Sequence, residues 1–187
     1  MLITLRSLER LSAGHSIVEI FKTKFPTGEA DVKEVLIWLE EINQYDWIGW
    51  MMSQTPELTQ AFLDVGADVH ASDNFALRWT AIKGHDKVVE LLIKAGADVH
   101  VDDDYALCTA AVNSHNKVVE LLIKAGANVH AGDDYALRQA AKYGHNKIVE
   151  LLIKAGANVH ADDDYALCVA AEYGHDKVIE LLKNIDT

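Results

Sequence analysis

Residues 105–134 read YALCTAAVNSHNKVVELLIKAGANVHAGDD, and residues 135–164 read YALRQAAKYGHNKIVELLIKAGANVHADDD. The two stretches are identical at 23 of 30 positions, which establishes a tandem repeat. A fixed period of roughly 20–50 residues is typical of solenoids, propellers and other stacked arrays. This period therefore predicts the fold more directly than any single motif.

The repeat extends along most of the 187-residue chain. Tyr-Ala-Leu opens the copies at residues 105, 135 and 165, and Phe75 replaces the tyrosine one copy earlier. A diverged first copy ends in Gly-Ala-Asp-Val-His, like the later ones. We predict five units, at residues 45–74, 75–104, 105–134, 135–164 and 165–187, after a separate segment of residues 1–44.

The sequence pattern of each unit predicts two helices joined by a turn. In the first helix Leu107, Ala110 and Ala111 lie at i, i+3 and i+4 and form one apolar stripe. A carboxylate just before this helix, such as Asp104, is placed to cap its first amides. A single helix pair cannot bury its apolar surface, so the units are expected to stack on one another.

The second helix is predicted from Lys117 to Lys124, with Glu120 and Lys124 as a favourable i,i+4 pair on its solvent face. Gly126 follows as a residue that can adopt the positive φ of a helix end.

The motifs of the unit resemble those of the ankyrin repeat over residues 45–187. They are Gly-His between the helices at residues 84, 144 and 174, Val118-Val119-Glu120-Leu121-Leu122, and Gly126-Ala127-Asn128-Val129. The resemblance implies an all-α solenoid that binds proteins and is not an enzyme. The usual unit has about 33 residues. The missing positions fall between Val129 and Tyr135, so we expect shortened hairpin loops.

Both ends of the stack are expected to be capped. Lys183 and Ile185 place a charge where a further unit would pack, which indicates a polar C-terminal cap. Residues 1–44 predict a helical N-terminal cap, with an amphipathic helix over residues 31–43 and a shorter helix through the leucines at 2, 5, 8 and 11. The tryptophans at 38, 47 and 50 either cover the first repeat or form an aromatic docking site.

The charge balance excludes some functions. The chain has 17 Lys and Arg against 29 Asp and Glu, a net charge of −12, which disfavours nucleic acid and anionic membrane surfaces. Its two cysteines lie two units apart, beyond disulfide reach. We expect a cytoplasmic monomer that binds a protein, such as a basic one.

Differences between the copies predict a binding surface. They concentrate at unit positions 4, 5, 8 and 9, on the side of the first helix opposite the apolar stripe. In ankyrin-like stacks that side lines the concave groove. The alternatives are neutral drift on a solvated face and local packing between units. The predicted contact residues are Arg78, Trp79, Ile82, Lys83, Val112, Asn113, Arg138, Lys142, Tyr143, Glu172 and Tyr173.

The aspartates before each first helix predict an acidic edge. Beyond one helix cap per unit, they form a solubilising ridge, a contact for a basic partner or a cation site. No calcium-loop spacing is present. The predicted edge residues are Asp102, Asp103, Asp133, Asp162 and Asp163.

Histidines recur every 15 residues from His85 to His175. Two positions per unit produce this spacing, and equivalent residues in stacked units are roughly 10 Å apart, too far to share a metal ion. We therefore expect structural histidines, no metal and no cofactor. No nucleophile, base and orienting group recur together, so no catalytic residue is predicted. The alternative function assigns the specific partner contact to residues 1–44, with the repeats as a scaffold.

Overall fold

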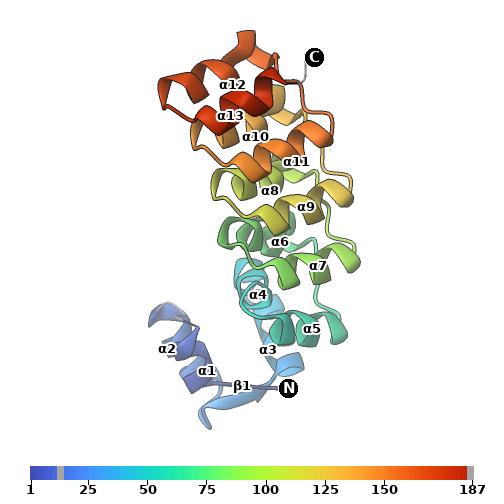
Figure 1. The fold of residues 1–187 in the computed structure, drawn as a ribbon. Coiled ribbons are helices and arrows are strands. Elements are labelled where there is room, and N and C mark those ends of the chain that lie inside the picture. Colours follow the sequence, from blue (N-terminus) through green and yellow to red (C-terminus); the bar gives the residue numbers. More distant parts are fainter. Residues whose placement is uncertain (12–14, 185–187) are drawn as a thin grey trace. The chain divides into compact units, whose positions relative to one another are not determined.

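The structure, a computed structural model, describes residues 1–11 and 15–184. Internal contacts divide the chain into two units, residues 1–76 and residues 77–187, and each is described by itself. Helices make up most of both units (Figure 1). The predicted boundary between residues 44 and 45 lies inside the first unit and stays a prediction.

The first unit combines a small sheet with five helices. Strands β1 and β2 pair antiparallel, with Ile3 opposite Ala30. The helix predicted through the leucines from residue 2 is wrong at its start, because that stretch is a strand until Thr4 caps the next helix in a reciprocal pair of hydrogen bonds with Ser7. The elements are β1 (Leu2–Thr4), α1 (Leu5–Arg10), α2 (His15–Lys24), β2 (Glu29–Asp31), α3 (Val32–Glu41), α4 (Tyr45–Met52) and α5 (Pro56–Asp64).

Helix α3 is the predicted amphipathic helix of the N-terminal segment. Asp31 caps its start: Asp31 Oδ1 accepts a hydrogen bond from the Lys33 amide, and Glu34 Oε2 accepts one from the Asp31 amide. Its buried Trp38 packs edge-on against Phe21 and Phe25, with ring centroids 6.5 and 5.5 Å away. The two other tryptophans of this unit lie half-buried on α4.

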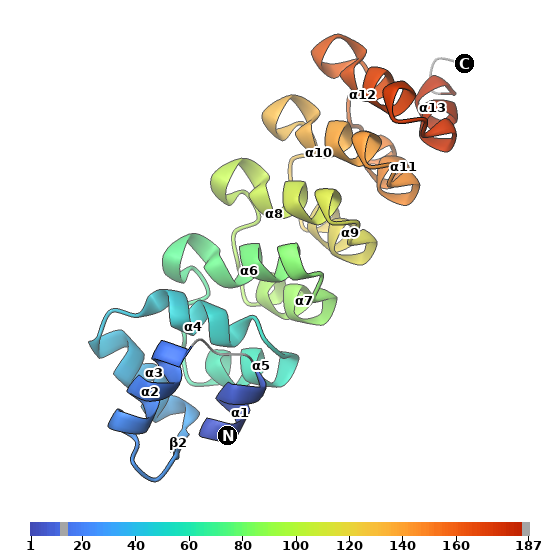
Figure 2. The same ribbon diagram turned by 90° about the vertical axis from the view of Figure 1, so that its left-hand side faces the viewer.

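The second unit is a stack of helix pairs. The first helices α8, α10 and α12 pack side by side in one layer, and α7, α9, α11 and α13 pack in a second layer (Figures 1 and 2). The stripe of Leu107, Ala110 and Ala111 is fully buried, as the sequence predicts. Its helices are α6 (Ala71–Lys83, which begins in the first unit), α7 (Asp86–Lys94), α8 (Val101–Val112), α9 (Asn116–Lys124), α10 (Ala131–Lys142), α11 (Asn146–Lys154), α12 (Ala161–Glu172) and α13 (Asp176–Lys183).

The ion pair and the helix-ending glycine predicted for the second helix are both confirmed. Lys124 donates to Glu120 at 2.7 Å, and this bond together with one from Lys117 lowers the pKa of Glu120 to about 2. Gly126 has a φ of +97°. Of the proposed C-terminal cap, Lys183 is exposed at the end of α13, whereas Ile185 lies outside the described residues.

Each loop that joins one repeat to the next ends in a turn of left-handed backbone. Asp102, Asp103 and Asp104 have φ of 53°, 57° and 56°, and residues 72–74, 132–134 and 162–164 repeat this conformation. The conformation costs most L-residues about 1–2 kcal/mol each, and it is tolerated best by glycine and by the short polar side chains of Asp and Asn. The turn stands where the sequence predicts a shortened hairpin, and the described loops of residues 77–184 contain no strand.

Ser114 shows the same strain at a helix-to-helix turn. It has a φ of +63°, whereas the equivalent positions are glycines 84, 144 and 174. We expect Ser114→Gly to stabilise the protein by about 0.5–1 kcal/mol, because glycine removes the steric cost of positive φ. Urea denaturation checks this, with Asn113→Gly, at a negative φ, as the destabilising control.

Candidate functional site

The third aspartate of each left-handed turn connects neighbouring repeats. Asp104 is 4% exposed, and its Oδ1 accepts a hydrogen bond from the backbone amide of Asn128 at 2.7 Å and one from His100 Nδ1 at 3.2 Å. The predicted helix cap is therefore wrong, because this carboxylate bonds across the repeat interface. The same bonds recur one repeat later among Asp134, Asn158 and His130.

The histidine that follows each helix-to-helix turn makes a second bond between repeats. His115 Nε2 lies 2.9 Å from the carbonyl oxygen of Ile82, where a ring N–H donates to the end of the preceding first helix. Loop and turn histidines thus lie at different places and bond to different atoms. The two later copies of this bond join His145 to Val112 and His175 to Lys142, at 3.0 and 2.9 Å.

The first aspartate of the turn pairs with an arginine on the first helix of its own repeat. Arg78 Nη1 lies 2.7 Å from Asp102 Oδ2, and Arg138 forms the same ion pair with Asp162. In the repeat between these two, Cys108 occupies the arginine position and Gly132 occupies the aspartate position. The two arginines are therefore committed to contacts within the protein, with 26% and 16% of their side chains exposed.

Arg138 also packs against two aromatic rings. Its guanidinium lies 5.9 Å from the ring centroid of Tyr135 and 5.4 Å from that of Tyr165, and its Nη2 donates to the carbonyl of Gly132 at 3.0 Å. Cation–π attraction and the ion pair together hold the side chain against the stack.

The middle aspartate of the turns at residues 102–104, 132–134 and 162–164 is a free surface charge. Asp103, Asp133 and Asp163 are exposed, and none has an ion-pair partner among residues 1–11 and 15–184. The predicted acidic edge therefore divides into paired positions, at Asp102 and Asp162, and this unpaired row. We call the three middle residues the acidic row.

Two exposed tyrosines lie at the ends of first helices. Tyr143 and Tyr173 are 49% and 54% exposed, at equivalent positions of neighbouring repeats. Tyr143 stacks on His145 with a centroid distance of 6.0 Å, and Tyr173 stacks on the next turn histidine at 6.3 Å. We call Tyr143 and Tyr173 the tyrosine pair.

The remaining predicted contact residues differ in exposure. Lys83 Nζ lies 5.0 Å from the Trp79 ring centroid, and Lys142 Nζ lies 5.8 Å from that of Tyr143. The exposed members are Lys83, Asn113 and Glu172, and the half-buried ones are Trp79, Ile82, Val112 and Lys142.

The two free cysteines are predicted to react at different rates. Cys168 is exposed, whereas Cys108 is 8% exposed and burial raises the pKa of its thiol to about 11. The thiolate is the reactive form, so iodoacetamide at neutral pH should label Cys168 and leave Cys108 protected until the protein unfolds. Intact and peptide mass spectrometry check this, with urea-unfolded protein as the control for full labelling.

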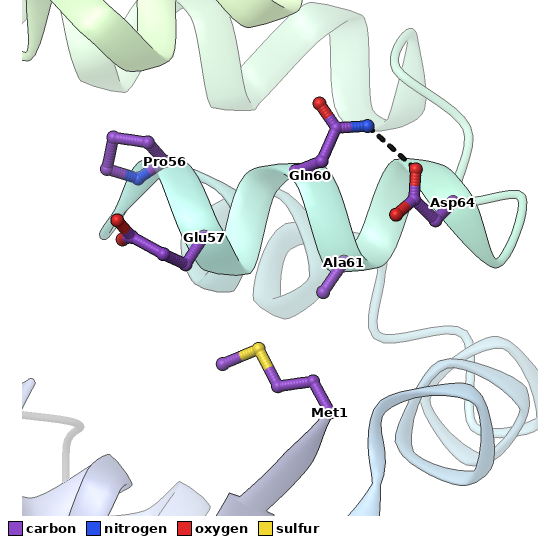
Figure 3. Close-up of a pocket in the computed structure, with 6 residues that line it drawn as sticks. All are labelled: Met1, Pro56, Glu57, Gln60, Ala61 and Asp64. Atoms are coloured by element: carbon purple, nitrogen blue, oxygen red, sulfur yellow. Dashed lines mark hydrogen bonds between the residues drawn. The ribbon is translucent and has the colours of Figure 1, made fainter.

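Three pockets among residues 1–11 and 15–184 have no predicted site residue in their lining. In the first unit, the Met1 side chain faces Ala61 across a shallow depression, beside a Gln60–Asp64 hydrogen bond of 2.7 Å on α5 (Figure 3). No group of three or more metal-ligating side chains occurs in the described ranges 1–11 and 15–184. Within the same ranges, no helix is long and apolar enough to cross a membrane.

The stacked helix pairs, linked by hydrogen bonds that recur between several repeats, define a helical repeat protein. A family model described as "Ankyrin repeats (3 copies)" matches residues 50–133 and again 129–187. The chain belongs to the ankyrin-repeat family, whose repeats are general protein–protein interaction modules and typically non-catalytic scaffolds. No curated protein matches the chain.

Proposed function

We propose that the protein is a non-catalytic adaptor or inhibitor that binds a basic protein through the tyrosine pair and the acidic row. The tyrosine pair carries the proposal, because each of its rings is about half exposed and stacked on a histidine that is bonded to the preceding repeat. The module is proposed to act as a cytoplasmic monomer without a cofactor. The two free cysteines and the net charge of −12 support this setting.

Preorganisation supports a binding role for the tyrosine pair. Tyrosine is enriched among residues that dominate binding energies, because it offers a large contact area with few rotatable bonds. The ring of Tyr143 rests on His145, which is itself bonded to Val112 O. Binding therefore loses little side-chain entropy.

The acidic row supports a basic partner. It presents one unpaired carboxylate per repeat, at intervals of roughly 10 Å set by helix packing. Because Asp102 and Asp162 are paired with arginines, the row carries the free negative charge of the turns. Charges arranged in this way accelerate association with an oppositely charged surface, and salt weakens the effect.

Neutralising the acidic row should slow partner association. Asp103→Asn, Asp133→Asn and Asp163→Asn together are expected to lower the association rate roughly tenfold at low salt, with little difference at high salt. The measurement is surface plasmon resonance with the partner recovered by affinity capture on the wild-type chain.

The matched control changes the same charge elsewhere. Glu90→Gln, Glu120→Gln and Glu150→Gln also remove one carboxylate per repeat, but these glutamates lie on second helices and pair with lysines. An equal effect of both triple variants would show that net charge, not the acidic row, controls association.

Exposed apolar residues favour residues 1–44 as the second candidate contact. Ile20, Ile37 and Ile42 are 40%, 47% and 39% exposed, and Ile37 lines a depression beside Phe25 and Trp38. Helix α3 packs against α4 and α5, so deleting the segment would disrupt residues 1–76. The variant Ile37→Ser tests the segment instead, and partner affinity unchanged by it would reject this second candidate.

A further inference from the structure

Arg138 shows how this repeat surface holds a guanidinium group. The group lies between the rings of Tyr135 and Tyr165, pairs with Asp162 and donates to the carbonyl of Gly132. Of these partners, Tyr135 is three residues earlier on the same helix, and Gly132 begins the preceding left-handed turn. The Tyr165 ring of the next repeat and the carboxylate of Asp162 complete the site.

One repeat earlier, the same framework lacks its arginine. Tyr105 and Tyr135 occupy the two ring positions and are 40% and 41% exposed. Cys108 stands in the place of Arg138, and Gly132 stands in the place of Asp162. Arg138 also donates to the carbonyl of Gly132, and the residue equivalent to Gly132 one repeat earlier is Asp102. Both the cation and its carboxylate partner are thus missing together.

Two sequence positions of the repeat, 24 residues apart, change together in three successive repeats. Arg78 pairs with Asp102 and Arg138 pairs with Asp162, 24 residues apart in both cases. Cys108 and Gly132 occupy the two corresponding sequence positions of the repeat between them. A lone arginine or a lone aspartate occurs in none of the three. The middle repeat therefore has two exposed rings and no cationic side chain at the position of Arg138, although Arg138 itself contacts the Tyr135 ring from the following repeat.

Two carboxylates lie close enough to Cys108 to act on its thiol. Burial is the main cause that raises the pKa of its thiol, and the carboxylates of Asp104 and Asp103 raise it further. A negative thiolate is thus disfavoured by the same carboxylates that would attract a cation. Asp103 Oδ2 lies 3.8 Å from the position that a Cβ on residue 132 would occupy.

We propose that Tyr105, Tyr135 and Asp103 form a receptor site for an arginine side chain of the protein partner, a refinement that rests on the proposed function. The partner's guanidinium would lie between the two rings, as Arg138 does one repeat later, with Asp103 as its carboxylate. Arginine fits better than lysine, because its planar group stacks on aromatic faces and donates several hydrogen bonds in a fixed geometry.

The test uses N-acetyl-arginine amide as the probe and NMR titration of the full chain as the measurement. We expect saturable shifts at the rings of Tyr105 and Tyr135, weaker shifts with N-acetyl-lysine amide and none with the uncharged citrulline analogue. Equal shifts with all three compounds, or shifts spread over the whole acidic surface, would overturn the proposal.

Two variants locate the site. The double variant Cys108→Arg with Gly132→Asp supplies the internal pair of the neighbouring repeats and should abolish the saturable shifts. If this variant does not fold by circular dichroism, Tyr105→Leu decides, with binding expected to weaken at least about threefold through loss of one cation–π contact. Unchanged binding in the folded double variant or in Tyr105→Leu would refute the site.

Failure of this site is distinguishable from failure of the proposed function. If partner binding depends on the tyrosine pair but not on Tyr105, only the arginine site is wrong. If partner binding depends on Tyr105 but not on the tyrosine pair, the proposed binding surface is wrong and the arginine site remains.

Discussion

Gly84→Ala is expected to destabilise the repeat stack of residues 77–184 by about 3 kcal/mol. Gly84 has a φ of +74°, which costs an L-residue with a Cβ about 1–2 kcal/mol. A Cβ at this position would also overlap the ring of His115 from the next repeat. Displacing that ring breaks its part-buried bond to Ile82 O, which adds about 1–3 kcal/mol when the carbonyl is left unpaired.

Gly174→Ala is the matched control for this prediction. Gly174 has nearly the same φ, +72°, but no atom lies within 4 Å of the Cβ that alanine would add. We expect it to cost only the backbone strain of about 1–2 kcal/mol. Urea denaturation of both variants measures the difference. Equal losses of stability would show that the histidine contact between repeats contributes nothing.

Asp134→Ala is expected to cost about 2–3 kcal/mol. It removes the acceptor of the Asn158 backbone amide and of His130 Nδ1, and hydrogen bonds to a charged group contribute about 1.5–3 kcal/mol. In a stack each repeat contacts only its neighbours, so the loss weakens coupling between two specific repeats. Hydrogen exchange should therefore accelerate most at the Asn158 amide.

Asp164→Ala is the control for this prediction, because it removes only the contact between the aspartate and the loop histidine. Asp164 retains the histidine contact, to His160 Nδ1 at 2.6 Å, but its side chain is 52% exposed. We expect a loss of less than about 1 kcal/mol, the usual value for an exposed pair. Protection of Asn158 that is unchanged in Asp134→Ala would contradict the assignment of the buried carboxylate as an inter-repeat link.

The repeat period predicts the second unit well, because stacking is encoded by short-range periodicity. The stripe of Leu107, Ala110 and Ala111, the end of α9 at Lys124 and the positive φ of Gly126 all follow from local rules. The strand at Leu2–Thr4 does not, because its leucine spacing also fits a helix and its pairing with residues 29–31 is a long-range contact.

The site was harder to predict because one residue type serves three purposes. Asp102, Asp103 and Asp104 look alike in the sequence, but the first forms an ion pair, the second is free and the third is buried between repeats. Their separate roles depend on the left-handed turn, which is not encoded by hydrophobic periodicity. The joint change of arginine with aspartate, 24 residues apart, is the sequence signal that identifies the ion pairs.

The most direct test of the proposed binding surface is the dissociation constant of the captured partner for Tyr143→Ala with Tyr173→Ala. Loss of two contact tyrosines should cost at least about 1 kcal/mol, an increase of about fivefold or more in the dissociation constant. The control is Tyr45→Ala, which removes a 41% exposed ring outside the tyrosine pair and should leave affinity unchanged. A double variant that binds as tightly as the wild-type chain would contradict the account.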